Sequence, residues 1–332
     1  MSATGTDPAA VPATGTQFQI TRNTPGGRAE ARIASLAGAL RSYSVGGTDF
    51  VETYPDTDLP PSACGILLAP WPNRVAGGKW LLGGRIQQLD ITEPSRGNAS
   101  HGLLRNTGYV RADPGDAAAG SHLPGSSVTL KAEIFPQHGY PFHLVHQVTY
   151  SLDDDGGLRV RQGLTNVGGS RAPFALGAHP FLRIGSVPVE DLTLTVSGNT
   201  RLTADERLIP SGREPADGPN DLRAGRRISE LKLDAAYTGL DLQDGEFRHR
   251  LEAPDGRRVL LWSGPEFGYV HVFVTDKLPG RACAVALEPM TAPANALNSG
   301  EGLRWLEPGT AFAAEWGIRP ERPAGSPAAG FA

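Results

Sequence analysis

The chain has 332 residues, of which 39% are hydrophobic and 20% are charged, so it can bury a substantial core and has the composition of an ordinary globular protein. Its net charge of −4 and its pI near 6.1 argue against partners that bind by charge, and we expect no contact with nucleic acid or with a membrane surface. Two cysteines, Cys64 and Cys283, are too few for a disulfide scaffold or a cysteine zinc site, and whether they pair is left open.

Both ends of the chain are predicted to be tails. Residues 1–16 are rich in Ala, Thr, Gly and Pro and lack the basic start and continuous apolar run of a signal peptide, so we expect disorder there. Residues 321–332 have a similar composition and the same prediction. No apolar run approaches the roughly 20 residues that cross a bilayer. We therefore expect one domain, residues 17–320, in a cytoplasmic protein that is a monomer or a homodimer.

Apolar and polar side chains alternate along most of the chain, which is the pattern of half-buried β-strands. Residues 77–91 contain two short runs around Gly83 and Gly84, and these glycines favour a tight hairpin turn. The later runs at period two cover residues 127–135, 144–152, 157–167, 191–198 and 269–276. No segment keeps a helical period for more than about three turns. The sequence thus predicts an all-β protein of packed antiparallel sheets.

Several familiar cofactor and metal motifs are missing from the sequence. His138, His143 and His146 lie close together, but His143 and His146 would point to opposite faces of a strand because they are three positions apart and side chains alternate between the faces. We therefore expect surface or edge histidines and no metal site. The chain has neither a glycine-rich phosphate loop nor a GxSxG nucleophile elbow, so we expect no cofactor.

Three compact polar clusters each centre on one side chain. In "PWPNRVAGG", prolines stiffen the segment that presents Arg74, and a guanidinium can donate two hydrogen bonds to one ligand. "GNASHGLLR" places His101 in a glycine-containing loop, and "GAHPFL" places His179 directly before Pro180, which restricts its backbone. Each cluster alone also fits a structural role, such as an ion-paired surface arginine or a packed histidine.

The fourth cluster begins where the apolar run of residues 284–287 ends in Glu288. Burying a carboxylate is costly unless it is paired, and partial burial favours the proton-accepting behaviour of a general base near neutral pH. An ion pair with one of the many arginines is the structural alternative. The loop that follows, with Asn295, Asn298 and Glu301, could brace this end of the strand.

Taken in order, the clusters resemble the aldose 1-epimerase family, the galactose mutarotase-like proteins. The resemblance is carried by "PWPNRVAGGKW", "GNASHGLLR", "LGAHPFL", "LDAAYTGL" and "LEPMTAPANALNSGEGLRWLEPG", which span most of the chain between its predicted tails. These motifs look most like the bacterial branch of the family. The resemblance implies a large antiparallel β-supersandwich and the interconversion of the α and β anomers of an aldohexose such as glucose or galactose.

The resemblance also implies a role for five residues. Glu288 matches the general base of the family and His179 its general acid. Arg74, His101 and Asp234 match residues that bind and orient the sugar. Opening and reclosing a pyranose ring by proton transfer needs no cofactor and no metal, and the expected partner is a small-molecule sugar.

The chain departs from the family pattern at three places. Phe181 stands where a tyrosine often follows "HP", and Asn106 and Thr107 stand where an aromatic residue is common after "HGLLR". Ala294 and Asn295 replace a frequent Pro-Asp pair. None of these departures affects the five proposed roles, but each can change which sugar fits.

Three other functions remain open at this point. A hexose-6-phosphate 1-epimerase would need arginines aimed at the phosphate, for which Arg96 and Arg105 are candidates. A non-catalytic carbohydrate-binding protein would have no need of both Glu288 and His179. A glycoside hydrolase would normally need two carboxylates across the scissile bond.

Overall fold

A computed structural model describes residues 11–112 and 125–321, and this part of the chain is built almost wholly from antiparallel strands. The single α-helix in the described part, α1 (Ala296–Ser299), is one turn long. The predicted all-β fold is therefore confirmed. No helix in these two ranges has the length and apolar character needed to cross a membrane.

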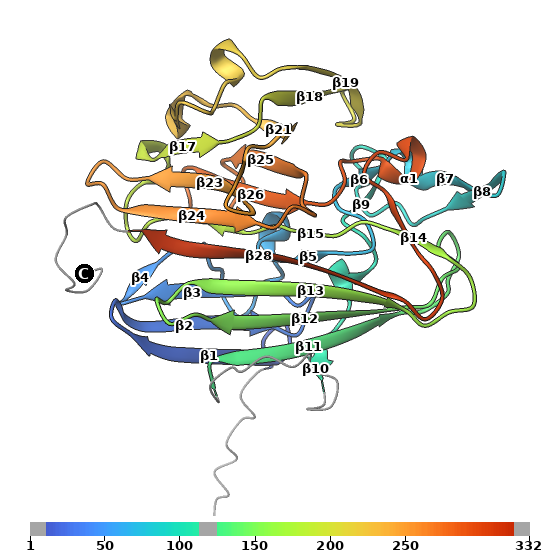
Figure 1. Cartoon of the computed structure of the whole chain (residues 1–332), viewed down its shortest axis with the longest axis horizontal. Helices are drawn as coiled ribbons and strands as arrows, with labels where there is room; N and C mark the ends of the chain where they lie inside the picture. Colours follow the sequence, from blue (N-terminus) through green and yellow to red (C-terminus); the bar gives the residue numbers. More distant parts are fainter. Residues whose placement is uncertain (1–10, 113–124, 322–332) are drawn as a thin grey trace, which may run out of the picture.

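The largest sheet has ten strands and crosses the front of the molecule in Figure 1. In spatial order they are β10 (Val110–Arg111), β11 (Ser127–Ile134), β12 (Leu144–Leu152), β13 (Leu158–Asn166), β28 (Ala311–Glu321), β24 (Arg258–Ser263), β23 (Glu246–Glu252), β17 (Thr193–Val196) and β20 (Arg226–Arg227), with β22 (Leu242–Gln243) paired to β23.

A second sheet has eight strands. Its order is β19 (Pro210–Pro215), β18 (Thr200–Ala204), β21 (Asp234–Thr238), β25 (Tyr269–Thr275), β26 (Ala284–Met290), β15 (Gly177–Ala178) and β5 (Leu67–Leu68), with β16 (Phe181–Leu182) paired to β26. A third sheet has four strands, β1 (Gln17–Thr24), β2 (Gly27–Ala34), β3 (Leu40–Val45) and β4 (Thr48–Asp49). Three small ribbons complete the fold: β6 (Arg74–Val75) with β9 (Ala99–Ser100), β7 (Lys79–Leu82) with β8 (Arg85–Gln88), and β14 (Ala172–Phe174) with β27 (Arg304–Leu306).

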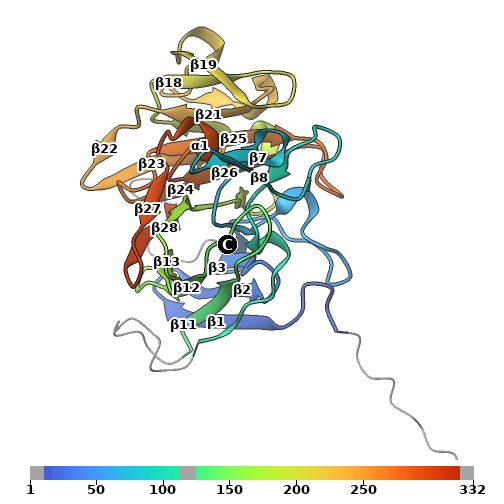
Figure 2. The same ribbon diagram turned by 90° about the vertical axis from the view of Figure 1, so that its right-hand side faces the viewer.

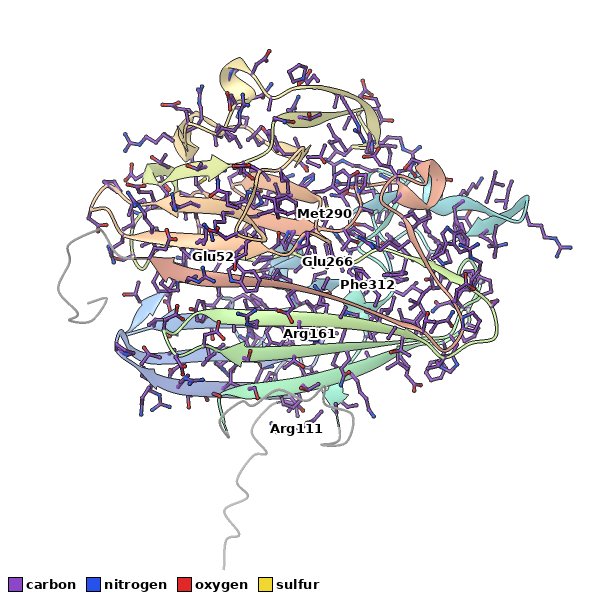
Figure 3. All side chains as sticks on the ribbon, in the orientation of Figure 1. Glu52, Arg111, Arg161, Glu266, Met290 and Phe312 are labelled. Atoms are coloured by element: carbon purple, nitrogen blue, oxygen red, sulfur yellow. The ribbon has the colours of Figure 1, made fainter. Side chains whose placement is uncertain are left out.

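One large hydrophobic core lies between the sheets, and side chains fill the space between the ribbons in Figure 3. In Figure 2, β23 and β24 lie to one side of β25 and β26. Leu251 and Leu261 of the ten-stranded sheet belong to the same buried cluster as Val272 and Leu287 of the eight-stranded sheet. Burial of these apolar faces stabilises the sandwich.

The predicted strands agree with the observed burial. Val128, Leu130, Ala132 and Ile134 of β11 are buried, whereas the residues between them are more exposed. The predicted hairpin is also present, because β7 and β8 pair across Gly83 and Gly84, which both have positive φ. His146 is an exception to the expected surface histidines: it is fully buried and bonds Tyr109.

The predicted tails fall largely on residues outside the described ranges. Within the described part, ordered chain begins before the predicted boundary at residue 17, since Ala13 donates a backbone hydrogen bond to Asp56 and Thr14 is buried. At the other end, β28 continues to Glu321. Cys64 and Cys283 are both free.

The alternation of side chains in two neighbouring strands determines where the polar groups of the second sheet lie. In β26, Val285 and Leu287 face the large core, so Ala286 and Glu288 point to the other face. In β25, Val272 likewise faces the core, which turns its neighbours outward to the same face as Glu288. Glu288 lies within β26 rather than at its end, because the strand continues through Pro289 to Met290.

Candidate active site

All five residues that the resemblance singled out line one cavity of about 330 Å³ on this outer face of the eight-stranded sheet. The cavity is walled by Pro60, Ser62, Ala63, Asn73, Arg74, Thr92, Glu93, Arg96, Ser100, His101, Arg105, His179, Asp234, His271, Phe273, Lys277 and Glu288. The predicted site residues come from segments between positions 74 and 288, and the fold brings them together.

His179 and Glu288 form a buried pair at the bottom of this site. The distance from His179 Nε2 to Glu288 Oε1 is 3.2 Å, and both side chains are almost completely buried. Burial lowers the pKa of His179, and the nearby Glu288 carboxylate opposes this effect only in part. An imidazole and a carboxylate therefore lie side by side with little access to solvent.

The imidazole of His179 is held in one orientation by its neighbours. Phe181 stacks on it with ring centroids 5.3 Å apart, and Phe273 meets its edge at 6.4 Å. The backbone is held as well, because the His179 N–H donates to Ile66 and its carbonyl accepts from Gly65. Phe181, which departs from the common tyrosine of the family, thus serves as a flat apolar support for the histidine.

His101 lies in a strained loop beside His179. Its φ is 64°, in the left-handed region that non-glycine residues rarely adopt, and its N–H donates to the carbonyl of Asn73 at 2.8 Å. The next residue, Gly102, packs so closely on the carbonyl of Ala69 that a Cβ would collide with it. These constraints bring the His101 ring to within 5.4 Å of the His179 ring, centroid to centroid.

Arg74 is held by a carboxylate at the edge of the cavity. Its Nε and Nη2 donate to the two oxygens of Glu93 at 2.8 and 3.0 Å, and its Nη1 donates to Asn73 Oδ1 at 3.2 Å. Arg96 also donates to Glu93, at 3.1 Å. The bidentate pair holds the guanidinium plane in place against the cavity.

Asp234 is paired with a histidine that the sequence did not single out. His271 Nε2 lies 2.7 Å from Asp234 Oδ1. Burial opposes ionisation of both groups, but their hydrogen bond and opposite charges outweigh it, so the pKa of Asp234 falls to about 2 and that of His271 is raised. His271 also lies directly opposite Glu288 in the pairing of β25 with β26.

His271 is thus the main residue of the cavity that sequence reasoning missed. A signal was present: in the run "YVHVFVTD", His271 falls between Val270 and Val272, on the face opposite the core. Arg105 and Lys277 also line the cavity, and in the described ranges neither forms an ion pair with a carboxylate.

Three buried polar atoms at the site have no hydrogen-bond partner among the described residues: Nδ1 of His101, Nδ1 of His179 and Oε2 of Glu288. Such groups are rare and costly in folded proteins, and a cluster of them is typical of a site that binds a polar ligand. No group of three or more His, Cys, Asp or Glu side chains in the described segments is arranged to hold a metal ion.

Comparison with known sequences agrees with the geometry. A sequence model of the aldose 1-epimerase family matches residues 19–319. YihR, an uncharacterized protein of Escherichia coli K12, is 32% identical over 281 residues, which is 84% of this chain and 86% of YihR. Human galactose mutarotase is 26% identical over 237 residues, 67% of this chain and 66% of the human protein.

Solved structures show the same fold. A galactose mutarotase-like protein from Clostridium acetobutylicum superposes with a TM-score of 0.78 at 16% identity, over 92% of this chain and 95% of the other. A galactose 1-epimerase from Lactobacillus acidophilus gives a TM-score of 0.74 at 17% identity, over 91% and 93%. The fold is therefore the predicted galactose mutarotase-like supersandwich, and this chain belongs to the aldose 1-epimerase family.

Proposed function

We propose that the protein is an aldose 1-epimerase that interconverts the α and β anomers of a free aldohexose such as glucose or galactose. The observation that carries this proposal is the buried His179–Glu288 pair, 3.2 Å apart, in a cavity lined by polar side chains. In an aldopyranose, the C1 hydroxyl and the ring oxygen O5 are bonded to the same carbon. A donor and an acceptor held side by side match these two atoms.

In the proposed reaction the sugar loses one proton from its C1 hydroxyl and gains one on its ring oxygen O5. Glu288 takes the proton from the C1 hydroxyl while the C1–O5 bond breaks, and protonated His179 gives a proton to O5. The products are an open-chain aldehyde and its C5 hydroxyl. After rotation about C1–C2 the ring closes on the other face, and the two residues exchange roles. Each positioned proton transfer is typically worth about 10²–10⁴-fold in rate.

Arg74, His101 and Asp234 are proposed to bind and orient the sugar. Arg74 and Asp234 are held by Glu93 and His271, so they supply fixed donors and acceptors to hydroxyl groups. Burial lowers the pKa of His101 well below its usual value, so this ring is neutral at pH 7 and can both donate and accept. Correct placement of C1 beside Glu288 depends on this polar wall.

Polarimetry on freshly dissolved α-D-glucose and α-D-galactose tests the proposal. We expect the wild-type protein to accelerate mutarotation of at least one sugar, and Glu288→Gln to lose about 10²–10⁴-fold of that rate because it cannot accept the proton. Glu266→Gln is the matched control, because Glu266 does not line the cavity, and it should keep the wild-type rate. An unchanged rate in Glu288→Gln contradicts the assigned base.

A hexose-6-phosphate 1-epimerase is the second candidate, and one observation favours it. Arg96, Arg105 and Lys277 line the cavity, and the last two form no ion pair with a carboxylate in the described part of the chain. A phosphate group would be attracted to these cations. Measuring kcat/KM for glucose and for glucose 6-phosphate under one condition decides between them: preference for the phosphate ester by tenfold or more replaces the first candidate with the second.

A further inference from the structure

We propose that His271, as an imidazolium held by Asp234, is a positioning residue that sets the pH range in which His179 acts as the acid beside Glu288. The inference rests on the proposed function, since it concerns the two residues to which that function assigns the proton transfers. His271 is not expected to exchange protons with the sugar.

The first support is a row of three side chains across three adjacent strands. In the pairing of β25 with β26, His271 lies opposite Glu288. In the pairing of β21 with β25, His271 lies opposite Ala236, two residues from Asp234 on the same face of the strand. His271 therefore occupies the middle position between the two carboxylates, and it lines the same cavity.

The second support is the set of charged and polar groups that face His271. From β21, Asp234 accepts a hydrogen bond from Nε2 at 2.7 Å, and from β26 comes the charge of Glu288. From the segment before and within β6 come Asn73 and the positive Arg74, which opposes a charge on His271. The Asn73 amide is 3.5 Å from Nδ1, too long for a strong bond, so the two carboxylates dominate and the charged ring is favoured.

The positive charge of His271 acts differently on Glu288 and on His179. The positive ring and the Glu288 carboxylate attract one another, which holds the charge of His271 beside the catalytic pair. The same positive ring opposes a second positive charge on His179, and it is one of the causes that lower the pKa of His179. His101, the remaining ring of the cluster, is affected in the same way. His271 thus moves the ionisation of His179 toward lower pH.

The test is the pH profile of kcat/KM for His271→Gln, measured by polarimetry on the sugar that the wild type turns over. Glutamine keeps an N–H donor for Asp234 but removes the charge. We expect the alkaline limb of the bell-shaped profile to move to higher pH by about one unit, because His179 then holds its proton to higher pH. A role in folding alone would lower the rate at every pH and leave the limbs in place.

His249→Gln is the matched control. His249 is a buried histidine of β23 that does not line the cavity, so its substitution removes an equally buried ring without touching the acid–base pair. We expect the limbs of its profile to coincide with those of the wild type.

A histidine ring titration by NMR provides a readout that does not depend on activity. The resonance that disappears in His271→Gln should titrate in the wild type with a pKa above 6.5, and Asp234→Asn should move this pKa downward even if His271→Gln does not fold. A ring that titrates at or below 6.5, or an alkaline limb that does not move, overturns the inference. Failure of the proposed function is separate, because it would appear as an inactive wild type.

Discussion

At the scale of single residues, the site places the buried His179–Glu288 pair beside a second, charged pair, Asp234–His271. Burial lowers the pKa of His179, whereas the Asp234–His271 bond raises the pKa of His271 and lowers that of Asp234. The 2.7 Å hydrogen bond to Asp234 is therefore one reason why the pKa of His271 is raised while that of His179, in the same cavity, is lowered. His179 can lose its proton near neutral pH, and His271 retains it.

The Asp234–His271 pair should make the free energy of unfolding depend on pH. The pKa of Asp234 is lowered from 3.8 to about 2, so its contribution is present above about pH 4 and is lost as pH falls toward 2. The pKa of His271 is raised above 6.5, so its contribution is present below pH 6.5 and is lost as pH rises through the raised value. Together the two groups stabilise the fold most between about pH 4 and 6.5.

Asp234→Asn should therefore lower the free energy of unfolding by an amount on the order of 2 kcal/mol within that window, and by less at higher pH. Tm should fall most in the same window. Thermal melts from pH 4 to pH 9 measure the difference from wild type. Asp276 is an exposed carboxylate that does not line the cavity, so Asp276→Asn should change Tm little at any pH. A difference for Asp234→Asn that does not vary with pH contradicts the coupling.

At the scale of elements, strand alternation and a few fixed backbone contacts create the site. Side chains of β25 and β26 alternate between the core and the cavity, so Leu287 and Glu288 serve different parts of the molecule. The His101 loop is fixed differently, by left-handed backbone at His101 and by the close approach of Gly102 to Ala69.

Gly102→Ala tests the close approach of Gly102 to the Ala69 carbonyl. The new Cβ would collide with the Ala69 carbonyl, in addition to the strain of positive φ, so we expect lower stability and a higher KM for the sugar as His101 moves. Gly83→Ala is the matched control: Gly83 also has positive φ, but a Cβ there meets nothing within 4 Å. We expect about 1 kcal/mol of destabilisation for Gly83→Ala, clearly more for Gly102→Ala, and a changed KM only for Gly102→Ala. Equal effects of the two changes would show that the close contact is unimportant.

The strands could be predicted from the sequence because period-two alternation is local, as in β11 and β12. The partner of Asp234 could not, since it depends on how β21 pairs with β25, and no local pattern specifies that pairing. Glu288 was expected at the end of a strand, yet β26 continues through Pro289 because the apolar residues on both sides keep it paired with β25. The sequence does not single out His271, because its neighbours are all apolar or aromatic and the pattern of the run is typical of a core strand.

At the scale of the whole molecule, a large two-sheet core supports a small polar cavity. Val272 and Leu287 pack into the same cluster as residues of the ten-stranded sheet, and Ala286 and Phe181 form a second cluster under the site. Asp234, His271 and Glu288 thus stand on paired strands, which hold a site's geometry better than loops do, whereas His101 and His179 lie in short connections between strands.

Leu287→Ala should separate stability from chemistry. Removing a fully buried leucine from the core should cost about 2–5 kcal/mol of unfolding free energy. The side chain faces away from the cavity, so the folded fraction should keep the pH limbs of the wild-type profile. Denaturant unfolding measures the first effect and polarimetry the second, and a shift of the limbs would contradict the separation of the two faces.

His179 and Glu288 are proposed to act as one acid–base unit. The most direct measurement is the mutarotation rate of Glu288→Gln, His179→Asn and the double variant, compared by polarimetry with wild type on the same sugar. If the residues work together, the double variant should be no more than a few-fold slower than the slower single variant, since either change alone disables the unit. Losses that multiply, or a His179→Asn variant that keeps the wild-type rate, would contradict the claim.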